Sequence, residues 1–211
     1  MKKKIAYLFT WTWGVAALLA GCGKSGDELA GRTQRALDSL TTSRYFADPD
    51  VRQELRGELA AFYQNRQYRL AWVSGEKPLA QAEDLLKSID RAYQEGFQPD
   101  DYNAKEIRSL QQKVFGANAR DNNRLADLIE LDFRMTANYL TYASHLFSGR
   151  TNPTRLNKDW LSKPRKKDLS AYLEAAIGNN QVGQSLADLL PRSAQYTNLR
   201  QQLMHYAAIG A

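Results

Sequence analysis

The stretch RLADLIELDFRMTANYLTYASHLFSGRTNP, residues 124–153, decides the fold. Its apolar residues recur three and four positions apart, which predicts a long helix that lays one broad face on a core. Gly149 and Pro153 mark its end, because glycine readily closes a helix and proline cannot continue one. The apolar positions of this face are Leu125, Leu128, Ile129, Phe133, Leu140, Ala143, Leu146 and Phe147.

Two polar residues, Asp132 and Thr136, fall on or beside this apolar face. A carboxylate in such a place is costly unless it is hydrogen-bonded or paired. We therefore expect Asp132 to be a structural residue that a neighbouring backbone N–H or an arginine satisfies. The alternative is a catalytic carboxylate, for which the sequence offers no partner acid, base or metal.

The rest of the chain predicts an all-α, or nearly all-α, fold. A length of 211 residues suggests one domain. We expect a single-domain helical bundle with one short extended segment at residues 62–73, where Tyr68, Leu70 and Trp72 alternate with smaller or charged residues. The other predicted helices cover residues 28–41, 51–63, 78–95, 103–115, 168–178, 182–190 and 196–208.

The N-terminal segment has the pattern of a targeting sequence. Three lysines precede an apolar run from Ile5 to Leu19, which has the length of a signal-peptide core and is short for a membrane span. The run ends in Leu19-Ala20-Gly21-Cys22, which resembles the lipobox of bacterial lipoproteins, whose cysteine carries a diacylglycerol. An ordinary signal peptide with an incidental cysteine is the alternative.

The lipobox divides the chain into three parts. We expect a lipoprotein signal peptide over residues 1–21, a lipidated tether over 22–27 that begins at Cys22, and a helical domain over 28–211. Lipid attachment anchors a protein to a membrane without spanning it. No Asp follows Cys22, which resembles outer-membrane sorting in enteric-type bacteria. The expected location is therefore the periplasmic face of the bacterial envelope, with the outer membrane as the anchoring surface.

Composition argues against several classes of function. The formal net charge is +6, and removing Lys2, Lys3 and Lys4 leaves 26 basic against 23 acidic side chains. This bias is too small to indicate a nucleic-acid partner. One Cys and two His cannot readily form a zinc site. The sequence contains neither a glycine-rich phosphate loop nor a Gly-x-Ser-x-Gly elbow, so we predict no cofactor, no metal and no catalytic residue.

Two clusters have binding character. Arg66, Tyr68 and Trp72 lie together in the extended segment, and we expect them to form a partner surface with Arg150. Arginine and aromatic residues are enriched at interface hot spots, and arginine grips carboxylates through two hydrogen bonds. The alternative is a packed tryptophan among solvated charges, with either arginine paired to Asp132. The second cluster is Lys163–Lys167 beside Trp160.

Several stretches together resemble the N-terminal scaffold domain of large periplasmic L,D-transpeptidases. They are FYQNRQYRLAWV (62–73), GFQPDDY (96–102) and LIELDFRMTANYLTYASHLFSGRTNP (128–153). Trp160 and the later pattern Pro191, Tyr196, Leu199 also fit the family. The resemblance covers about residues 50–207. It implies a helical scaffold and a role in peptidoglycan metabolism.

The chain departs from those enzymes in one respect. In the family, a peptidoglycan-binding module and a catalytic domain with a Ser-His-Gly-x-x-x-Cys-type motif follow the scaffold, whereas these residues contain no Cys besides Cys22. A cysteine nucleophile is essential to that reaction. We therefore expect a non-catalytic, lipid-anchored scaffold or interaction protein in cell-wall remodelling, with peptidoglycan or a cell-wall enzyme as partner. The alternative is the N-terminal part of a split or truncated L,D-transpeptidase.

Overall fold

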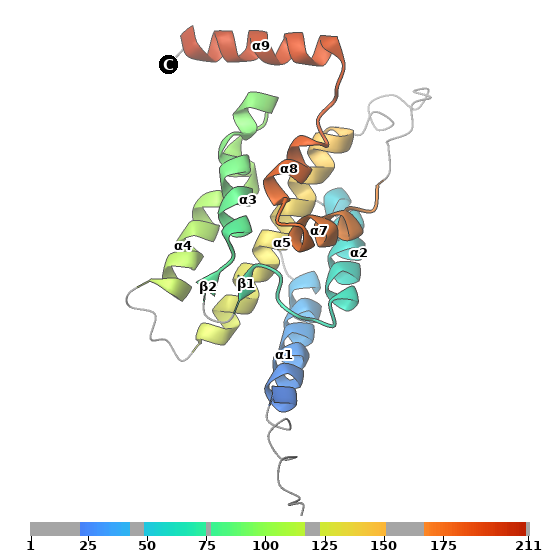
Figure 1. The fold of residues 1–211 in the computed structure, drawn as a ribbon, viewed down its shortest axis with the longest axis vertical. Coiled ribbons are helices and arrows are strands. Elements are labelled where there is room, and N and C mark those ends of the chain that lie inside the picture. The colour runs from blue at the N-terminus through green and yellow to red at the C-terminus, as the bar shows by residue number, and fades with distance from the viewer. Residues whose placement is uncertain (1–21, 43–48, 75–76, 117–122, 151–166, 210–211) are drawn as a thin grey trace, which may run out of the picture.

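A computed structural model describes residues 22–42, 49–74, 77–116, 123–150 and 167–209. The chain forms helices around one long central helix, α5, which spans Arg124–Ser148 (Figure 1). In chain order the other elements are α1 (Cys22–Thr42), α2 (Pro49–Asn65), β1 (Val73–Ser74), β2 (Lys77–Pro78), α3 (Ala80–Asp90), the 3-10 helices η1 (Ala92–Glu95) and η2 (Pro99–Tyr102), α4 (Ala104–Phe115), α7 (Leu169–Gly178), α8 (Val182–Ala187) and α9 (Ala194–Ile209). The mostly helical prediction is confirmed.

The central helix is covered on more sides than its sequence pattern predicts. Helices α1, α2, α3, α4 and α7 all contact α5. From Leu131 to Leu140 every residue except Arg134 is buried, including Leu131 and Asn138 on faces away from the predicted stripe. Leu128, which we expected in the core, is only half-buried. The prediction that α5 buries one broad face was therefore wrong. The spacing of apolar residues along a helix does not indicate how many other elements pack against it.

The extended segment is shorter and lies later in the chain than expected. Helix α2 continues to Asn65, and the only strands among the described residues are β1 and β2. They pair antiparallel, with Val73 opposite Pro78 and Ser74 opposite Lys77. Residues 66–72 form turns and bends in place of the predicted strand. The alternation of apolar and polar residues there arises from side chains that reach the core from a loop.

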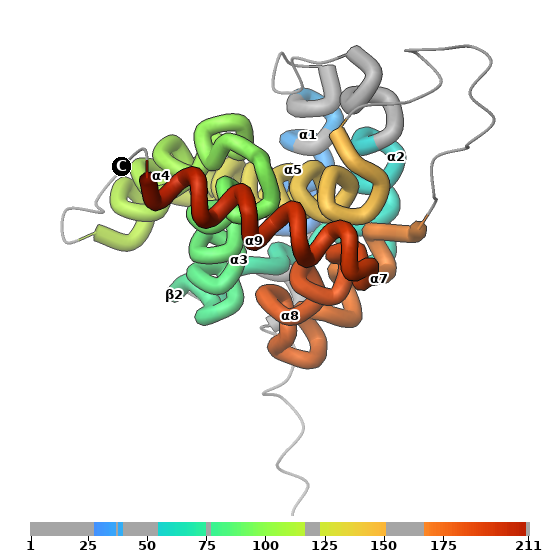
Figure 2. Tube along the Cα trace, turned by 90° about the horizontal axis from the view of Figure 1, so that it is seen from above, coloured from blue at the N-terminus to red at the C-terminus, as the bar shows by residue number. Residues whose placement is uncertain are grey.

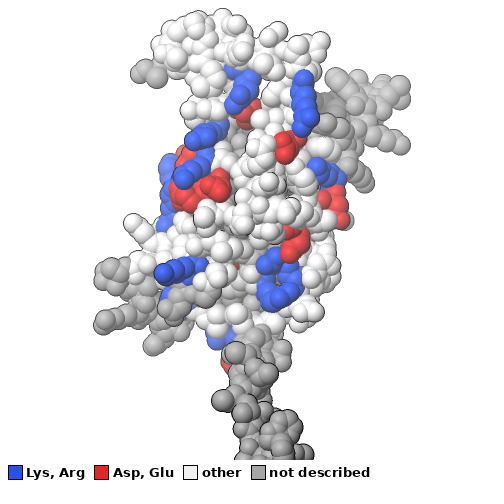
Figure 3. Space-filling view, in the orientation of Figure 1, with Lys and Arg blue, Asp and Glu red and all other residues white. Residues whose placement is uncertain are grey.

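The C-terminal helix α9 lies across one end of the bundle, over the ends of other helices (Figure 2). None of its residues is buried, and it contacts mainly η1. The large apolar side chains Leu199, Tyr206 and Ile209 are each about 70% exposed. This end of the molecule is mostly uncharged, whereas charges of both signs are interspersed below it (Figure 3).

The expected signal peptide, residues 1–21, lies outside the described residues. Helix α1 begins at Cys22, so residues 22–27, which we expected to form a tether before the first helix, are helical and belong to α1. No helix in the part of the chain that the structure describes is long and apolar enough to cross a membrane.

Candidate functional site

The carboxylate of Asp132 lies in the core, completely shielded from solvent. Its Oδ2 accepts hydrogen bonds from the backbone amides of Ala71 and Trp72, each at 2.8 Å. Its Oδ1 accepts a hydrogen bond from the hydroxyl of Tyr63 at 2.5 Å. Among the described residues, two amides and a tyrosine provide the hydrogen bonds that this buried carboxylate needs, and no arginine donates to it.

Thr136, one helical turn after Asp132, completes this network. Its Oγ1 accepts a hydrogen bond from Trp72 Nε1 at 2.9 Å and lies 2.9 Å from the hydroxyl of Tyr63. The Thr136 hydroxyl is also 3.0 Å from the backbone carbonyl of Asp132, to which it donates. The network thus ties α2 and the loop that follows it to the central helix.

A tight turn after α2 brings the two amides to Asp132. Gln67 and Tyr68 have positive φ angles of 53° and 58°, and the Tyr68 amide donates to the Tyr63 carbonyl at 2.7 Å. Left-handed backbone at non-glycine residues is unfavourable, so the contacts that follow must hold it in place. The stretch FYQNRQYRLAW therefore supplies both the tyrosine and the amides that surround the carboxylate.

Burial raises the pKa of Asp132 to about 6, while the hydrogen bonds from Tyr63, Trp72 and Ala71 lower it. A carboxylate in such an environment could serve as an acid or base if a substrate reached it. Asp132 and its partners Tyr63 and Trp72 are all shielded from solvent. The geometry therefore gives Asp132 and Thr136 a structural role, in which they hold α2 and the loop after it against α5.

The stretch GFQPDDY fastens the other end of α5. Gly96 has a φ of 79°, a left-handed conformation that ends η1 and turns the chain toward η2. From η2, the Tyr102 hydroxyl lies 3.0 Å from Nδ1 of His145, and Asp101 accepts a hydrogen bond from Arg150 at 2.5 Å. The stretches 62–73 and 96–102, which carry the family resemblance, thus both contact α5 and have a structural role there.

The predicted partner surface is not formed as we expected. Trp72 is completely buried, so its assignment to a surface was wrong. Arg66 donates two hydrogen bonds to Glu174 at 2.6 and 2.8 Å, and its side chain is only 16% exposed. Arg66 also donates to the Arg69 and Leu70 carbonyls, so intramolecular contacts occupy its guanidinium.

The other two members of that surface lie apart. Tyr68 is half-buried against the core. Arg150 lies two residues beyond the end of α5 at Ser148, and that end is about 24 Å along the helix from Asp132, which the Arg66 loop contacts. Of the second cluster, Trp160 and residues 163–166 lie outside the described residues, and Lys167 stacks 3.6 Å from the centre of the Tyr172 ring. The structure does not unite these residues in one site.

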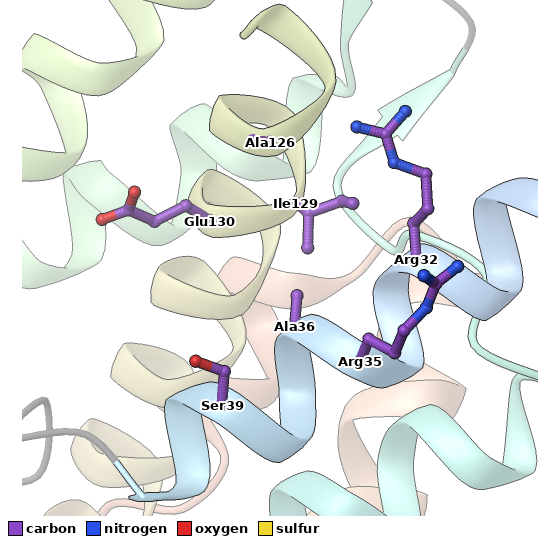
Figure 4. A pocket seen from close by; sticks show the side chains of 7 residues that line it. All are labelled: Arg32, Arg35, Ala36, Ser39, Ala126, Ile129 and Glu130. Carbon is purple, nitrogen blue, oxygen red and sulfur yellow. The ribbon is translucent and has the colours of Figure 1, made fainter.

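A different site lies between α1 and α5. A cavity of about 380 Å³ is lined by Arg32, Arg35, Ala36, Ser39, Ala126, Ile129 and Glu130 (Figure 4). The two arginine side chains lie at one side, Glu130 lies at the other, and Ala36 and Ile129 lie between them. The cavity therefore has a cationic end, an apolar floor and an end with a carboxylate, which suits a small polar ligand.

Sequence reasoning missed this cavity. Arg32 and Arg35 are three residues apart on one helix, a spacing that places side chains on the same face. That spacing was the available signal, but it does not reveal that α5 lies opposite. Within the described ranges, no group of three or more His, Cys, Asp or Glu residues could hold a metal ion.

Comparison with known proteins identifies the family. The family model described as Scaffold domain matches residues 57–203, more than half of the chain. The match begins within α2 and ends within α9, so it includes the whole Asp132 network but not α1. Neither a curated protein nor a solved structure matches the chain. The protein belongs to the Scaffold domain family, in agreement with its resemblance to the scaffold domain of L,D-transpeptidases.

Proposed function

We propose that this protein is a lipid-anchored, non-catalytic binding protein that acts in peptidoglycan remodelling at the periplasmic face of the bacterial envelope. The observation that carries the proposal is the Scaffold domain match over residues 57–203, which includes most of the helical bundle. The role in peptidoglycan metabolism follows from the resemblance to L,D-transpeptidases. The anchor follows from the lipobox that ends at Cys22.

The non-catalytic part of the proposal rests on chemistry. The only cysteine in these residues is Cys22, whose thiol is consumed when it carries lipid. Without a thiolate, these residues offer no nucleophile for the acyl transfer that the family's enzymes perform. The buried carboxylate Asp132 offers no substitute, because its hydrogen-bond partners enclose it.

An assay with peptidoglycan fragments tests this function. Purified full-length lipoprotein in detergent is incubated with disaccharide-tetrapeptides, and the products are separated by liquid chromatography and identified by mass spectrometry. We expect no cross-linked dimers and no exchange of the terminal residue of the stem peptide. Cross-linked products would contradict the non-catalytic role and favour the L,D-transpeptidase alternative.

The same preparation tests the anchor. Mass spectrometry of the N-terminal peptide is expected to show a diacylated or triacylated Cys22, and the Cys22→Ala variant should no longer be retained in the membrane fraction. An unmodified Cys22 at the mature N-terminus would contradict the lipid anchor while leaving the peptidoglycan role open.

A further inference from the structure

We propose that the cavity between α1 and α5 binds the carboxylate end of a peptide whose last residues have small apolar side chains. The binding chemistry is argued from the cavity alone. Only the choice of a peptidoglycan stem as the natural source of such a peptide rests on the proposed function. Arg32 and Arg35 supply the charge for the carboxylate, and the apolar floor receives the side chain.

The two arginines of the cavity differ from five other described arginines, which pair with carboxylates. Arg32 makes no ion pair or hydrogen bond with any described residue, and Arg35 donates only its Nε, to the Gly31 carbonyl at 3.1 Å. Their terminal nitrogens are thus available to an anion, and both residues are exposed. By contrast, five arginines each contact a carboxylate: Arg66 with Glu174, Arg108 with Asp90, Arg134 with Glu130, Arg150 with Asp101 and Arg200 with Glu95.

Two arginines three residues apart on α1 line the same side of the cavity and place two positive charges there. Like charges three residues apart on a helix repel each other, so this arrangement favours a ligand that neutralises them. Each guanidinium can donate two parallel hydrogen bonds to a carboxylate or a phosphate. In Figure 4 both side chains extend from α1 on the same side of the cavity.

The other residues that line the cavity favour the carboxylate end of a peptide over other anions. Ala36, Ala126 and Ile129 form an apolar floor next to the arginines, which inorganic phosphate would leave unused. Beyond the floor, Arg134 contacts Oε1 of Glu130, whose other carboxylate oxygen is Oε2. This oxygen can accept a hydrogen bond from a ligand N–H, which a fatty acid lacks and a peptide has.

The position of the cavity argues against a lipid headgroup. Arg32 is ten residues beyond Cys22 on the same continuous helix, so the helical rise separates them by about 15 Å. This distance exceeds the screening length of about 8 Å in physiological salt. The cavity residues on α1 also lie outside residues 57–203, the part of the chain that matches the family model.

Calorimetric titration tests the assignment with two matched ligands. N-acetyl-alanyl-alanine carries the free carboxylate, and its C-terminal amide differs only in lacking that charge. We expect the full-length protein to bind the acid at least about tenfold more tightly than the amide, because charged hydrogen bonds to two arginines are lost. No binding of the acid, or equal binding of acid and amide, would overturn the proposal.

Variants locate the binding in the cavity. Arg32→Gln with Arg35→Gln should weaken binding of the acid at least about tenfold. Arg192→Gln, an exposed arginine that does not line the cavity, should leave it unchanged. Ala36→Leu keeps both arginines but fills the floor, and it should also reduce binding. Wild-type affinity in the double variant or in Ala36→Leu would overturn the assignment.

Two further titrations test the choice among anions. Inorganic phosphate and vesicles containing phosphatidylglycerol should each bind more weakly than N-acetyl-alanyl-alanine, and tighter binding of either would overturn the peptide assignment. Failure here is separate from failure of the envelope role, because free dipeptide measures the cavity and intact peptidoglycan measures the role.

Discussion

Asp132 places an ionisable group at the centre of a helical bundle, and its surroundings can accept either protonation state. When ionised, it receives hydrogen bonds from Tyr63 and from two backbone amides. When protonated, it can donate to the Tyr63 hydroxyl, whose own proton can turn to Thr136, 2.9 Å away. The network therefore persists while the charge changes.

This property gives a prediction about pH. The folded pKa is about 6 and the ordinary value is 3.8, so between these values the folded state keeps a proton that the unfolded state has lost. The contribution of Asp132 to the free energy of unfolding is therefore fully present below pH 4 and is lost as pH rises through 6. A shift of about two units corresponds to about 3 kcal/mol.

Urea unfolding at several pH values checks this contribution against the Asp132→Asn variant. Asn can accept from both amides and donate to Tyr63, so it keeps the hydrogen bonds but does not titrate. The difference in unfolding free energy between wild type and Asp132→Asn should change by about 2–3 kcal/mol between pH 4 and pH 7, with wild type losing stability. A difference that is constant with pH would show that burial does not shift this carboxyl group.

The sequence located Asp132 and Thr136 at the core helix but could not name their partners. Tyr63 and Trp72 lie 69 and 60 residues before Asp132, and no local pattern links residues so far apart. Arg66 was likewise assigned to a partner surface because its partner, Glu174, lies 108 residues further along the chain. Short-range patterns report which residues are apolar, but the fold decides which polar residues meet.

At the scale of elements, α5 carries the largest share of the core, and burial separates residues that the sequence treated alike. Leu131 is 1% exposed, whereas Leu128 is half-buried. Leu131→Ala should lower the free energy of unfolding by about 2–5 kcal/mol, because it removes buried contacts and leaves a cavity. Leu128→Ala, the same chemical change, should cost about 1 kcal/mol or less.

Equilibrium unfolding in urea measures both variants. Equal destabilisation by the two substitutions would mean that Leu128 belongs to the core as the sequence pattern predicts.

The bounds of α5 could be predicted from its helical spacing and from Gly149, whose φ is 86° just after the last helical residue. The faces that α5 buries could not be predicted, because α1, α2, α3, α4 and α7 all contact it.

Helix α9 is held to the bundle by a small polar contact. Arg200 donates to Glu95 at 2.8 Å and to Gln94 at 2.9 Å, and Tyr196 donates to the second oxygen of Glu95. The Glu95 side chain is only 6% exposed, so solvent screens this contact weakly. Since no residue of α9 is buried, we expect these bonds to control the position of the helix.

The Glu95→Gln variant tests this attachment. Removing the charge should increase hydrogen exchange of the α9 amides about tenfold, while exchange in α5 and the melting temperature remain nearly unchanged. Hydrogen exchange resolved by mass spectrometry gives both regions in one experiment. Uniformly faster exchange, or no change in α9, would contradict a locally attached helix.

At the scale of the whole molecule, Cys22 begins α1 at one end of the bundle and α9 crosses the opposite end (Figure 1). If lipid holds Cys22 at the membrane, the family-matched bundle follows α1 away from the surface. The sequence predicted the helical class and the family, because helical spacing and ordered motifs are local. It could not predict the cavity between α1 and α5, because that site requires two elements that the sequence separates.

The central claim is that this scaffold binds peptidoglycan without chemically altering it, and co-sedimentation with purified sacculi tests this most directly. Full-length lipoprotein in detergent is mixed with sacculi and centrifuged, and the pellet is analysed for protein and for muropeptides. We predict that the protein sediments with the sacculi and that the muropeptide pattern is unchanged. Protein that stays in the supernatant, or new cross-linked muropeptides in the pellet, would contradict the account.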